Sequence, residues 1–228
     1  MRRVRNFKTA CPVIVCALLT FMLIAPSAEA FQYWTNKDGS ATYFDWANGG
    51  SDNGYFGSPI LVAGNTFCFF PSNFRAETSN GTQTTTDRFE VELTAHTNYS
   101  FTGIKVTEYG TYGMLAGGQL ASWGNMTLTD LNDAGVFSTD SLATTPSFPI
   151  TSGSGSWSAT AEVNNINWTR IKFELYDNLL AYSVGGSTNF IQKDVVGSAV
   201  AVEFVIPEPS MMTGLGLGLL MLIRRRKA

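Results

Sequence analysis

The sequence predicts an all-β protein, a two-sheet antiparallel sandwich that is jelly-roll-like in size. Apolar residues recur with a period of two, as in strands with one buried face, and no sustained helical period of 3.6 is present. Gly, Asn, Asp and Ser separate about ten such runs, as in short strands joined by turns. With 16 Phe, 8 Tyr and 5 Trp against 14% charged residues, the chain can fill a hydrophobic core.

The first thirty residues have the three parts of a secretory signal peptide. A basic segment from Arg2 to Lys8 precedes an apolar run over 11–25, and Ala28 and Ala30 flank Glu29 after it. The run is shorter than the roughly 20 residues of a membrane-spanning helix, and a small-x-small motif marks a cleavage site. We therefore expect residues 1–30 to direct export through the Sec machinery and to be removed after Ala30.

The clearest strands lie in the middle of the chain. In 87–96, apolar residues from Phe89 to Ala95 alternate with charged and polar ones, so one face is core and the other is water. The run 99–110 shifts its parity at Gly103, which predicts a β-bulge there. Further strands are expected over 32–35, 41–46, 60–70 with an interruption at Gly64-Asn65, 120–128 and 157–163.

The C-terminal part of the body predicts a hairpin and a final strand. In 170–184 the alternation breaks at Asp177-Asn178, which we interpret as a turn between two strands, the second burying Leu180, Tyr182 and Val184. The run 199–205 alternates as a last strand. Residues 138–156 carry no strand signal and are predicted to form a long surface loop within one domain, and 130–135 a turn of helix. The β-sandwich domain is thus predicted to span residues 31–205.

Charge and cysteine content narrow the function of this body. Between Phe31 and Ile206, seven Lys or Arg stand against sixteen Asp or Glu, a net charge of about −9. Nucleic acid is therefore not an expected partner, because its binding depends on cations that neutralise phosphates. Once the signal peptide is removed, Cys68 is the only cysteine, so no intrachain disulfide can form. Its aromatic and β-branched neighbours predict a buried, inert thiol.

The chain ends in three ordered features. Pro207, Glu208 and Pro209 are followed, after Ser210, by thirteen residues that are all apolar or Gly apart from Thr213. The basic cluster Arg224, Arg225, Arg226 and Lys227 comes next. A helix of thirteen residues spans roughly 20 Å, less than a hydrocarbon core of about 30 Å. The basic cluster would stop transfer and stay cytoplasmic, leaving the body outside.

This ending resembles the PEP-CTERM sorting signal, found on exported proteins of Gram-negative bacteria that make extracellular polysaccharide. The resemblance covers residues 206–228 only. It implies that an exosortase recognises Pro207-Glu208-Pro209, and that the C-terminal hydrophobic sorting helix holds the chain in the inner membrane transiently before the body reaches the cell surface or extracellular matrix. The alternative is a permanent C-terminal membrane anchor.

The sequence contains few candidates for catalytic residues. The single histidine, His96, lies on the polar face of its strand, and no G-x-S-x-G elbow is present. One His and one Cys cannot build the usual zinc site. Carboxylates at Glu90, Glu92 and Glu174 keep glycoside hydrolysis open as an alternative. Our main expectation is a protein that is not an enzyme.

The sequence offers two candidate binding sites, one for calcium and one for carbohydrate. Asp45, Asp52 and Asn53 stand in a Gly-rich segment that offers the oxygen ligands suited to calcium, although ordinary turns use the same residues. No other cofactor is expected. The run beginning at Asp130 starts like an EF-hand loop but lacks its later oxygen ligands.

A carbohydrate-binding site would be built from exposed aromatic rings. Trp46 and Trp168 are the tryptophans we expect to be exposed and able to stack on a sugar. We therefore expect an exported, non-catalytic structural or adhesive protein. A carbohydrate-binding, lectin-like module acting on extracellular polysaccharide is the alternative, and a glycoside hydrolase is the second alternative.

Overall fold

A computed structural model describes residues 30–115, 117–193 and 199–207, and within these ranges the chain forms β-strands joined by turns. The strands are, in chain order, β1 (Gln32–Tyr33), β2 (Gly39–Ser40), β3 (Phe44–Ser51), β4 (Ile60–Val62), β5 (Thr66–Phe69), β6 (Arg75–Thr78), β7 (Gly81–Ala95), β8 (Phe101–Met114), β9 (Gly118–Asp130), β10 (Phe137–Ser141), β11 (Ala143–Thr145), β12 (Gly153–Trp168), β13 (Arg170–Ser183), β14 (Asn189–Lys193) and β15 (Val200–Val205). These ranges hold no helix of the length and apolarity that a membrane span needs.

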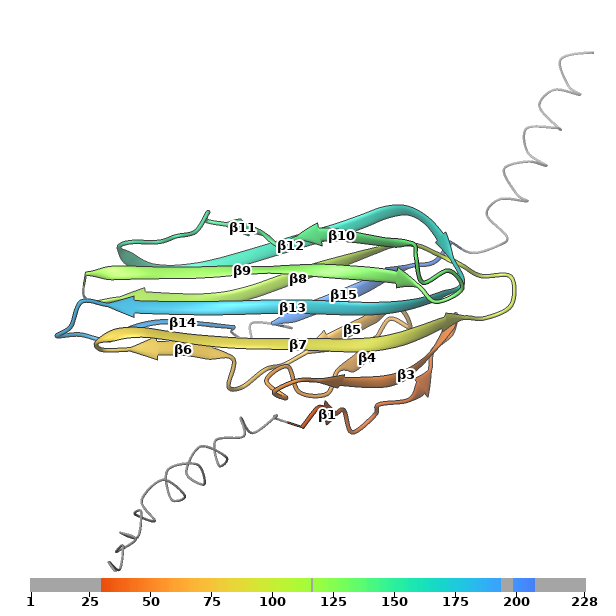
Figure 1. Cartoon of the computed structure of the whole chain (residues 1–228), viewed down its shortest axis with the longest axis horizontal. Coiled ribbons are helices and arrows are strands. Elements are labelled where there is room, and N and C mark those ends of the chain that lie inside the picture. The colour runs from red at the N-terminus through yellow and green to blue at the C-terminus, as the bar shows by residue number, and fades with distance from the viewer. Residues whose placement is uncertain (1–29, 116, 194–198, 208–228) are drawn as a thin grey trace, which may run out of the picture.

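The strands form two antiparallel sheets packed as a sandwich, which confirms the predicted fold class. Sheet 1 has seven strands in the order β1-β3-β7-β13-β9-β10, with β2 paired to β3. Sheet 2 has eight strands in the order β11-β12-β8-β15-β5-β4, with β14 bridging β8 and β6. In Figure 1 the long strands β9, β13 and β7 of sheet 1 run side by side across the picture.

The period-two alternation correctly predicted which side chains enter the core. Phe89, Val91 and Leu93 of β7 are buried, and so are Val200 and the other inward residues of β15. The interruption at Gly64 separates β4 from β5 as expected, with Gly64 at a φ of 76°. Cys68 of β5 is a buried free thiol, as its neighbours predicted.

Phenylalanines fill much of the space between the sheets. Nine are essentially inaccessible: Phe44, Phe56, Phe67, Phe69, Phe74, Phe89, Phe101, Phe173 and Phe204. Their rings meet mostly edge to face, and the centroids of Phe56 and Phe89 lie 4.9 Å apart. Such pairs add about 0.5–1.5 kcal/mol each beyond the burial of their area. The aromatic content of the sequence thus serves mainly to hold the two sheets together.

One edge of β8 is shared by two strands, with a break between them. β15 pairs with β8 over Gly103 to Glu108, and β14 pairs with it from Gly110 onward. Lys193 ends β14 opposite Gly110. Lys193 and Glu108 therefore meet at the place where the sheet changes partner.

The predicted hairpin at Asp177-Asn178 is wrong. β13 runs unbroken through both residues, and its inward positions continue with Asp177, Leu179 and Ala181. Tyr182, expected inside, is 39% exposed. The sequence misled because a buried aspartate is rare without a partner, and the partner of Asp177 lies on the other sheet.

The segment 138–156 is not a long loop, because it holds most of β10, the whole of β11 and the start of β12. β10 is an edge strand of sheet 1 and β11 an edge strand of sheet 2, so each extends a ladder of hydrogen bonds while burying few side chains. An edge strand of this kind needs no apolar alternation. The turn of helix expected over 130–135 is not formed, because Asp130 ends β9 and residues 131–135 form turns and a bend.

The irregularity expected at Gly103 lies on the neighbouring strand. The two-residue step from Phe101 to Gly103 in β8 faces the four-residue step from Asn164 to Trp168 in β12. Asn165 has a positive φ of 61° there. A Cβ at Gly103 would lie 2.8 Å from the carbonyl oxygen of Val163, so glycine permits this close approach.

Most of the expected targeting residues lie outside the described residues. These are the signal peptide up to Glu29, including Ala28, and the sorting segment from Glu208 to Ala228, including Pro209 and the cluster Arg224 to Lys227. Ala30 and Pro207 are described and are exposed.

Candidate functional site

The loop after β3 is held in shape by one buried carboxylate. Asp87 of β7 accepts hydrogen bonds from the backbone N–H groups of Asn53 and Tyr55, both at 2.8 Å, and from that of Phe56 at 3.4 Å. Asn53 also donates its side-chain amide to the carbonyl of Thr86 at 2.8 Å. The loop 52–57 is therefore fixed by the sheet beneath it.

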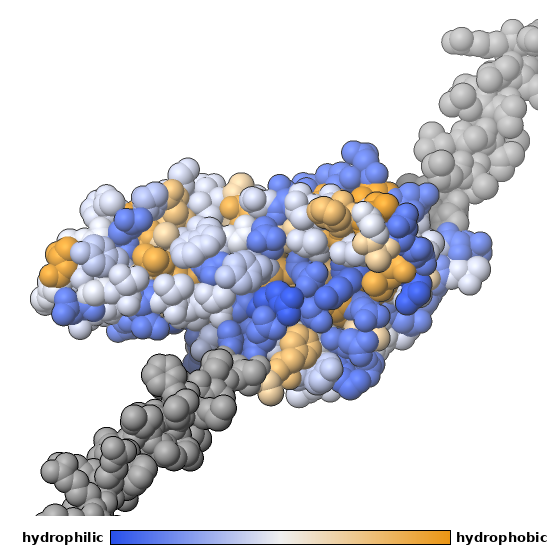
Figure 2. Space-filling view, viewed as in Figure 1, coloured by the Kyte–Doolittle hydropathy of each residue, from blue (hydrophilic) through white to orange (hydrophobic). Residues whose placement is uncertain are grey.

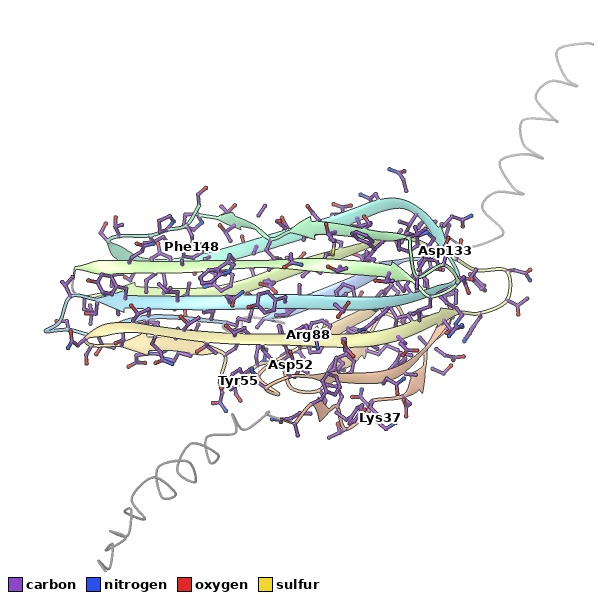
Figure 3. The ribbon with its side chains drawn as sticks, viewed as in Figure 1. Lys37, Asp52, Tyr55, Arg88, Asp133 and Phe148 are labelled. Atoms are coloured by element: carbon purple, nitrogen blue, oxygen red, sulfur yellow. The ribbon has the colours of Figure 1, made fainter. Side chains whose placement is uncertain are left out.

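Consecutive aromatic residues of this loop have opposite environments. Phe56 is fully buried and anchors the loop in the core. Tyr55 is 37% exposed, and its ring meets Phe74 edge to face at 5.9 Å between centroids. Arg88 holds the start of the loop through two hydrogen bonds of 3.1 Å to the Asp52 carboxylate. Figure 3 shows Asp52 and Tyr55 beside Arg88 and β7.

The loop borders two small surface hollows. The larger, of about 230 Å³, lies between Tyr55 and the segment 70–73 and is lined by Asn53, Gly54, Tyr55, Gly57, Phe70, Pro71, Ser72 and Asn73. The second, of about 150 Å³, shares Gly54 and Gly57 with the first and reaches Gln32, Tyr33 and Ser58. None of the described lining residues carries a charge. We call the two together the loop hollow.

Glycine keeps the floor of the loop hollow open. Gly54 and Gly57 adopt φ values of 73° and 69°, which glycine reaches without strain. A Cβ at Gly57 would meet no atom within 4 Å, so the space above it is empty. The aromatic walls, Tyr33, Tyr55 and Phe70, are between 37% and 61% exposed. The loop hollow thus combines exposed ring faces with amide and hydroxyl groups.

The expected calcium ligands do not come together. Asp45 and Asp52 stand at opposite ends of β3, so an extended strand keeps them roughly 20 Å apart. Asp45 contacts His96 at 3.1 Å, Asp52 pairs with Arg88, and Asn53 is committed to Thr86. Hydrogen bonds from Ser40 and then His96 lower the pKa of Asp45. Within the described ranges no cluster of three acidic, His or Cys residues is suited to a metal.

The two tryptophans expected to be exposed lie against the core. Trp46 is only 9% exposed, its indole nitrogen donates to the carbonyl of Asn36 at 2.9 Å, and its ring fills the space over Gly39. Trp168 is partly buried and packs against the core. Our expectation of exposure was therefore wrong for Trp46. Trp123 of β9 is the most exposed tryptophan of the described residues, at 44% exposure.

The carboxylates considered for glycoside hydrolysis belong to an ion-pair network on the outer side of sheet 1. Lys172 reaches Glu90 at 2.8 Å and Glu174 at 3.3 Å, and Arg88 reaches Glu174 at 3.1 Å. Glu92 instead accepts a hydrogen bond from the Asn48 amide at 3.3 Å. Figure 2 shows this face as mainly hydrophilic, with hydrophobic residues in scattered patches.

Sequence reasoning did not identify Phe70 and Asn73 as site residues, because Phe70 ends a run predicted as a strand and Asn73 lies in the bend after it. It also overlooked a buried group of three charged side chains, which we call the buried triad: Glu108, Asp177 and Lys193. Each side chain has no exposed surface. Parity could have revealed all three, because Glu108 continues the inward positions of β8 after Val106, Asp177 those of β13, and Lys193 those of β14 after Ile191.

Comparisons with known proteins give only distant likenesses. No family model matches the chain, and no curated protein does. The structure of TmCBM61 in complex with β-1,4-galactotriose aligns over 77% of this chain and 100% of its own, with 10% identity and a TM-score of 0.27. The enzymatically active domain of tailspike protein 4 of bacteriophage CBA120 aligns over 57% of this chain and 19% of its own, with 8% identity and a TM-score of 0.23. Values this low identify no common ligand or reaction.

Proposed function

We propose that this chain is an exported, non-catalytic β-sandwich protein that binds a neutral extracellular polysaccharide in the loop hollow. The observation that carries the proposal is the character of that hollow, which is rigid, uncharged among its described residues, and walled by exposed aromatic rings. Polysaccharide binding was the alternative to a purely structural role. The loop hollow now makes it the better explanation.

A sugar ring matches each part of this surface. Its C–H faces stack on aromatic rings, here Tyr55 and Phe70, and its hydroxyls pair with amides such as Asn53 and Asn73. Because Asp87 already fixes the loop, little conformational entropy is lost on binding. A hollow of about 230 Å³ is smaller than a typical drug-sized pocket. It suits one part of a long polymer chain.

Delivery outside the cell completes the proposal. The N-terminal leader would bring the chain to the Sec machinery, and an exosortase would process the segment after Pro207. Intact mass spectrometry of the protein from membrane and medium fractions tests this step. We expect a species that begins at Phe31 and ends near Glu208. A membrane species that retains Arg224 to Ala228 would instead indicate a permanent anchor.

The binding site is tested by Tyr55→Ala. Losing one stacking ring worth about 1–1.5 kcal/mol should weaken binding roughly tenfold. Affinity electrophoresis against a panel of neutral polysaccharides identifies the polymer, and calorimetry with an oligosaccharide of that polymer measures Kd. β-1,4-galactotriose is a convenient first oligosaccharide because it is the ligand of the compared module.

Tyr182→Ala is the matched control. Tyr182 has nearly the same exposure as Tyr55 but lies on the outer side of β13, away from the loop hollow. We expect it to bind like the wild type. Equal weakening by both variants, or weakening by Tyr182→Ala alone, would contradict the site. A wild-type protein that binds no polysaccharide of the panel would contradict the function and favour the structural or adhesive role.

A further inference from the structure

The buried triad joins the two sheets through the middle of the core. Glu108 of β8 and Lys193 of β14 belong to sheet 2, whereas Asp177 belongs to the central strand β13 of sheet 1. Lys193 Nζ donates to Glu108 Oε2 at 2.6 Å and also contacts the Asp177 carboxyl group. One amine therefore touches two carboxyl groups.

Aromatic rings surround this amine. Lys193 Nζ lies 5.1 Å from the ring centroid of Phe74, 5.4 Å from that of Trp157 and 5.8 Å from that of Phe56. All three rings are almost inaccessible to solvent. Asp87, which pairs in register with Asp177, is the neighbouring acid, and its oxygens accept the N–H groups of the loop 52–57. The buried triad is thus shielded from bulk water.

The hydrogen bonds of the triad are incomplete. Among the described residues, neither oxygen of Asp177 nor Oε1 of Glu108 has a partner with hydrogen-bond geometry. A buried carboxyl oxygen without a donor is costly in a structural ion pair. The Lys193 amine touches the Asp177 carboxyl group but makes no well-formed hydrogen bond to it. The two groups are therefore placed for a covalent bond to form between them.

We propose that Lys193 and Asp177 become joined by an intramolecular isopeptide bond, with Glu108 as the catalytic residue that moves the protons. The group contains each part that this condensation needs: an amine, a carboxylic acid in contact with it, and a second carboxyl group that touches the amine. Exclusion of water favours the amide over its hydrolysis, because water is the other product.

The reaction balances without any further reactant. Burial acts to lower the pKa of Lys193, but the neighbouring carboxyl groups of Asp177 and Glu108 outweigh burial, so that pKa is raised. One proton must therefore first pass from the ammonium of Lys193 to the Asp177 carboxylate, which gives a neutral amine beside a neutral acid. The Nζ–Cγ bond then forms, one Cγ–O bond of Asp177 breaks, and one water leaves.

Glu108 can serve both halves of this exchange. Burial, followed by the charge of Asp177, raises the pKa of Glu108 to about 8, so it holds a proton at neutral pH. It can donate that proton to one Asp177 oxygen and accept one from the attacking nitrogen. It can then donate a proton to the departing hydroxyl, which leaves as water, and take back the proton that remains on the other Asp177 oxygen. Glu108 ends the reaction unchanged.

A covalent link here would serve an exported protein. The chain after residue 30 has a single cysteine, so no disulfide within that chain can hold its sheets together. An amide between β13 and β14 would tie sheet 1 to sheet 2 and would resist reductants. It would also limit the unfolded chain in the same way as a disulfide does.

Mass spectrometry of the full chain tests the bond. After digestion, we expect a branched peptide in which Lys193 and Asp177 are linked, lighter by one water than the sum of its two arms. Peptide masses do not depend on how the termini are processed. Separate, unmodified peptides carrying Lys193 and Asp177 from folded protein would overturn the proposal.

Three variants separate the chemistry from the fold. Glu108→Gln should retain a folded circular-dichroism spectrum and lose the branched peptide almost completely. Asp177→Asn should form the same bond with loss of ammonia instead of water. Glu174→Gln, a surface carboxylate on the same strand, should link fully. A Glu108→Gln variant that still links would contradict the role of Glu108. If Glu108→Gln does not fold, the mass of the Asp177→Asn variant decides, because an unlinked Asp177→Asn variant would contradict the proposed reaction.

Discussion

The two faces of sheet 1 carry similar charges in opposite surroundings. On the outer face, Lys172 and Arg88 meet Glu90 and Glu174 while every one of these side chains keeps between 22% and 38% of its surface exposed. On the inner face, Asp177 of the same strand meets Lys193 and Glu108 with no exposure at all. The outer network has solvent to replace any lost partner, and the inner one does not.

This difference teaches that ion-pair geometry alone says little about energy. Exposed pairs are typically worth about 0–1 kcal/mol because water screens them. A buried charge that loses its partner has no substitute, so the cost of its desolvation remains. The comparison can therefore be tested by removing one cation from each face.

The largest effect is expected for Lys193→Met. It leaves Glu108 and Asp177 buried without a cation, and breaking a buried pair in this way costs about 3–5 kcal/mol. Loss of the proposed isopeptide bond would add to this cost. Urea unfolding at neutral pH, compared with the wild type, measures the change in the free energy of unfolding.

Replacing the whole buried triad by apolar residues is the control for that experiment. Lys193→Met together with Glu108→Leu and Asp177→Leu should recover much of the lost stability, because no unpaired charge remains. A triple variant as unstable as Lys193→Met would show that the unpaired buried charges did not cause the loss.

The pH dependence of stability should give the next largest effect. The pKa of Glu108 is raised from 4.5 to about 8 in the folded protein, mainly by burial. The folded state therefore binds this proton more tightly than the unfolded state does. Stability from this group is complete below about pH 4.5 and is lost as the pH rises to about 8.

Glu108→Gln sharpens the test because it cannot titrate. Unfolding by urea at several pH values should show the wild type losing stability relative to Glu108→Gln across that window. The direction is the same whether or not the isopeptide bond has formed, since Glu108 is buried in both cases. Parallel curves for the two proteins would contradict the raised pKa.

The smallest effect is expected for Lys172→Ala on the outer face. Glu174 keeps its contact with Arg88, and both glutamates remain partly hydrated, so the free energy of unfolding should change by less than about 1 kcal/mol. Added salt should reduce even this difference. A loss as large as that of Lys193→Met would remove the distinction between the two faces.

Part of the loop hollow was within reach of the sequence. The Gly-rich segment that holds Asp52 and Asn53 was singled out for its oxygen ligands, and it does form one wall of the hollow. The prediction that these residues bind calcium was wrong because both side chains already have partners on β7. Arg88 binds the Asp52 carboxylate, and the Thr86 carbonyl accepts a hydrogen bond from the Asn53 amide. Phe70 and Asn73, on the opposite wall, were not singled out, because Phe70 ends a predicted strand and Asn73 follows it in an irregular segment.

The sequence by itself determined the all-β class and the inward residues of β7 and β15, because period-two alternation is a local property of a strand with one wet face. The export and sorting segments stay predictions from the sequence, which short linear signals allow because they need no fold. Only the tertiary structure decided that Asp177 continues a strand instead of turning it, and that Trp46 is buried. Both depend on partners distant in sequence, Lys193 for the aspartate and the facing sheet for the tryptophan, and a one-dimensional pattern carries no record of them.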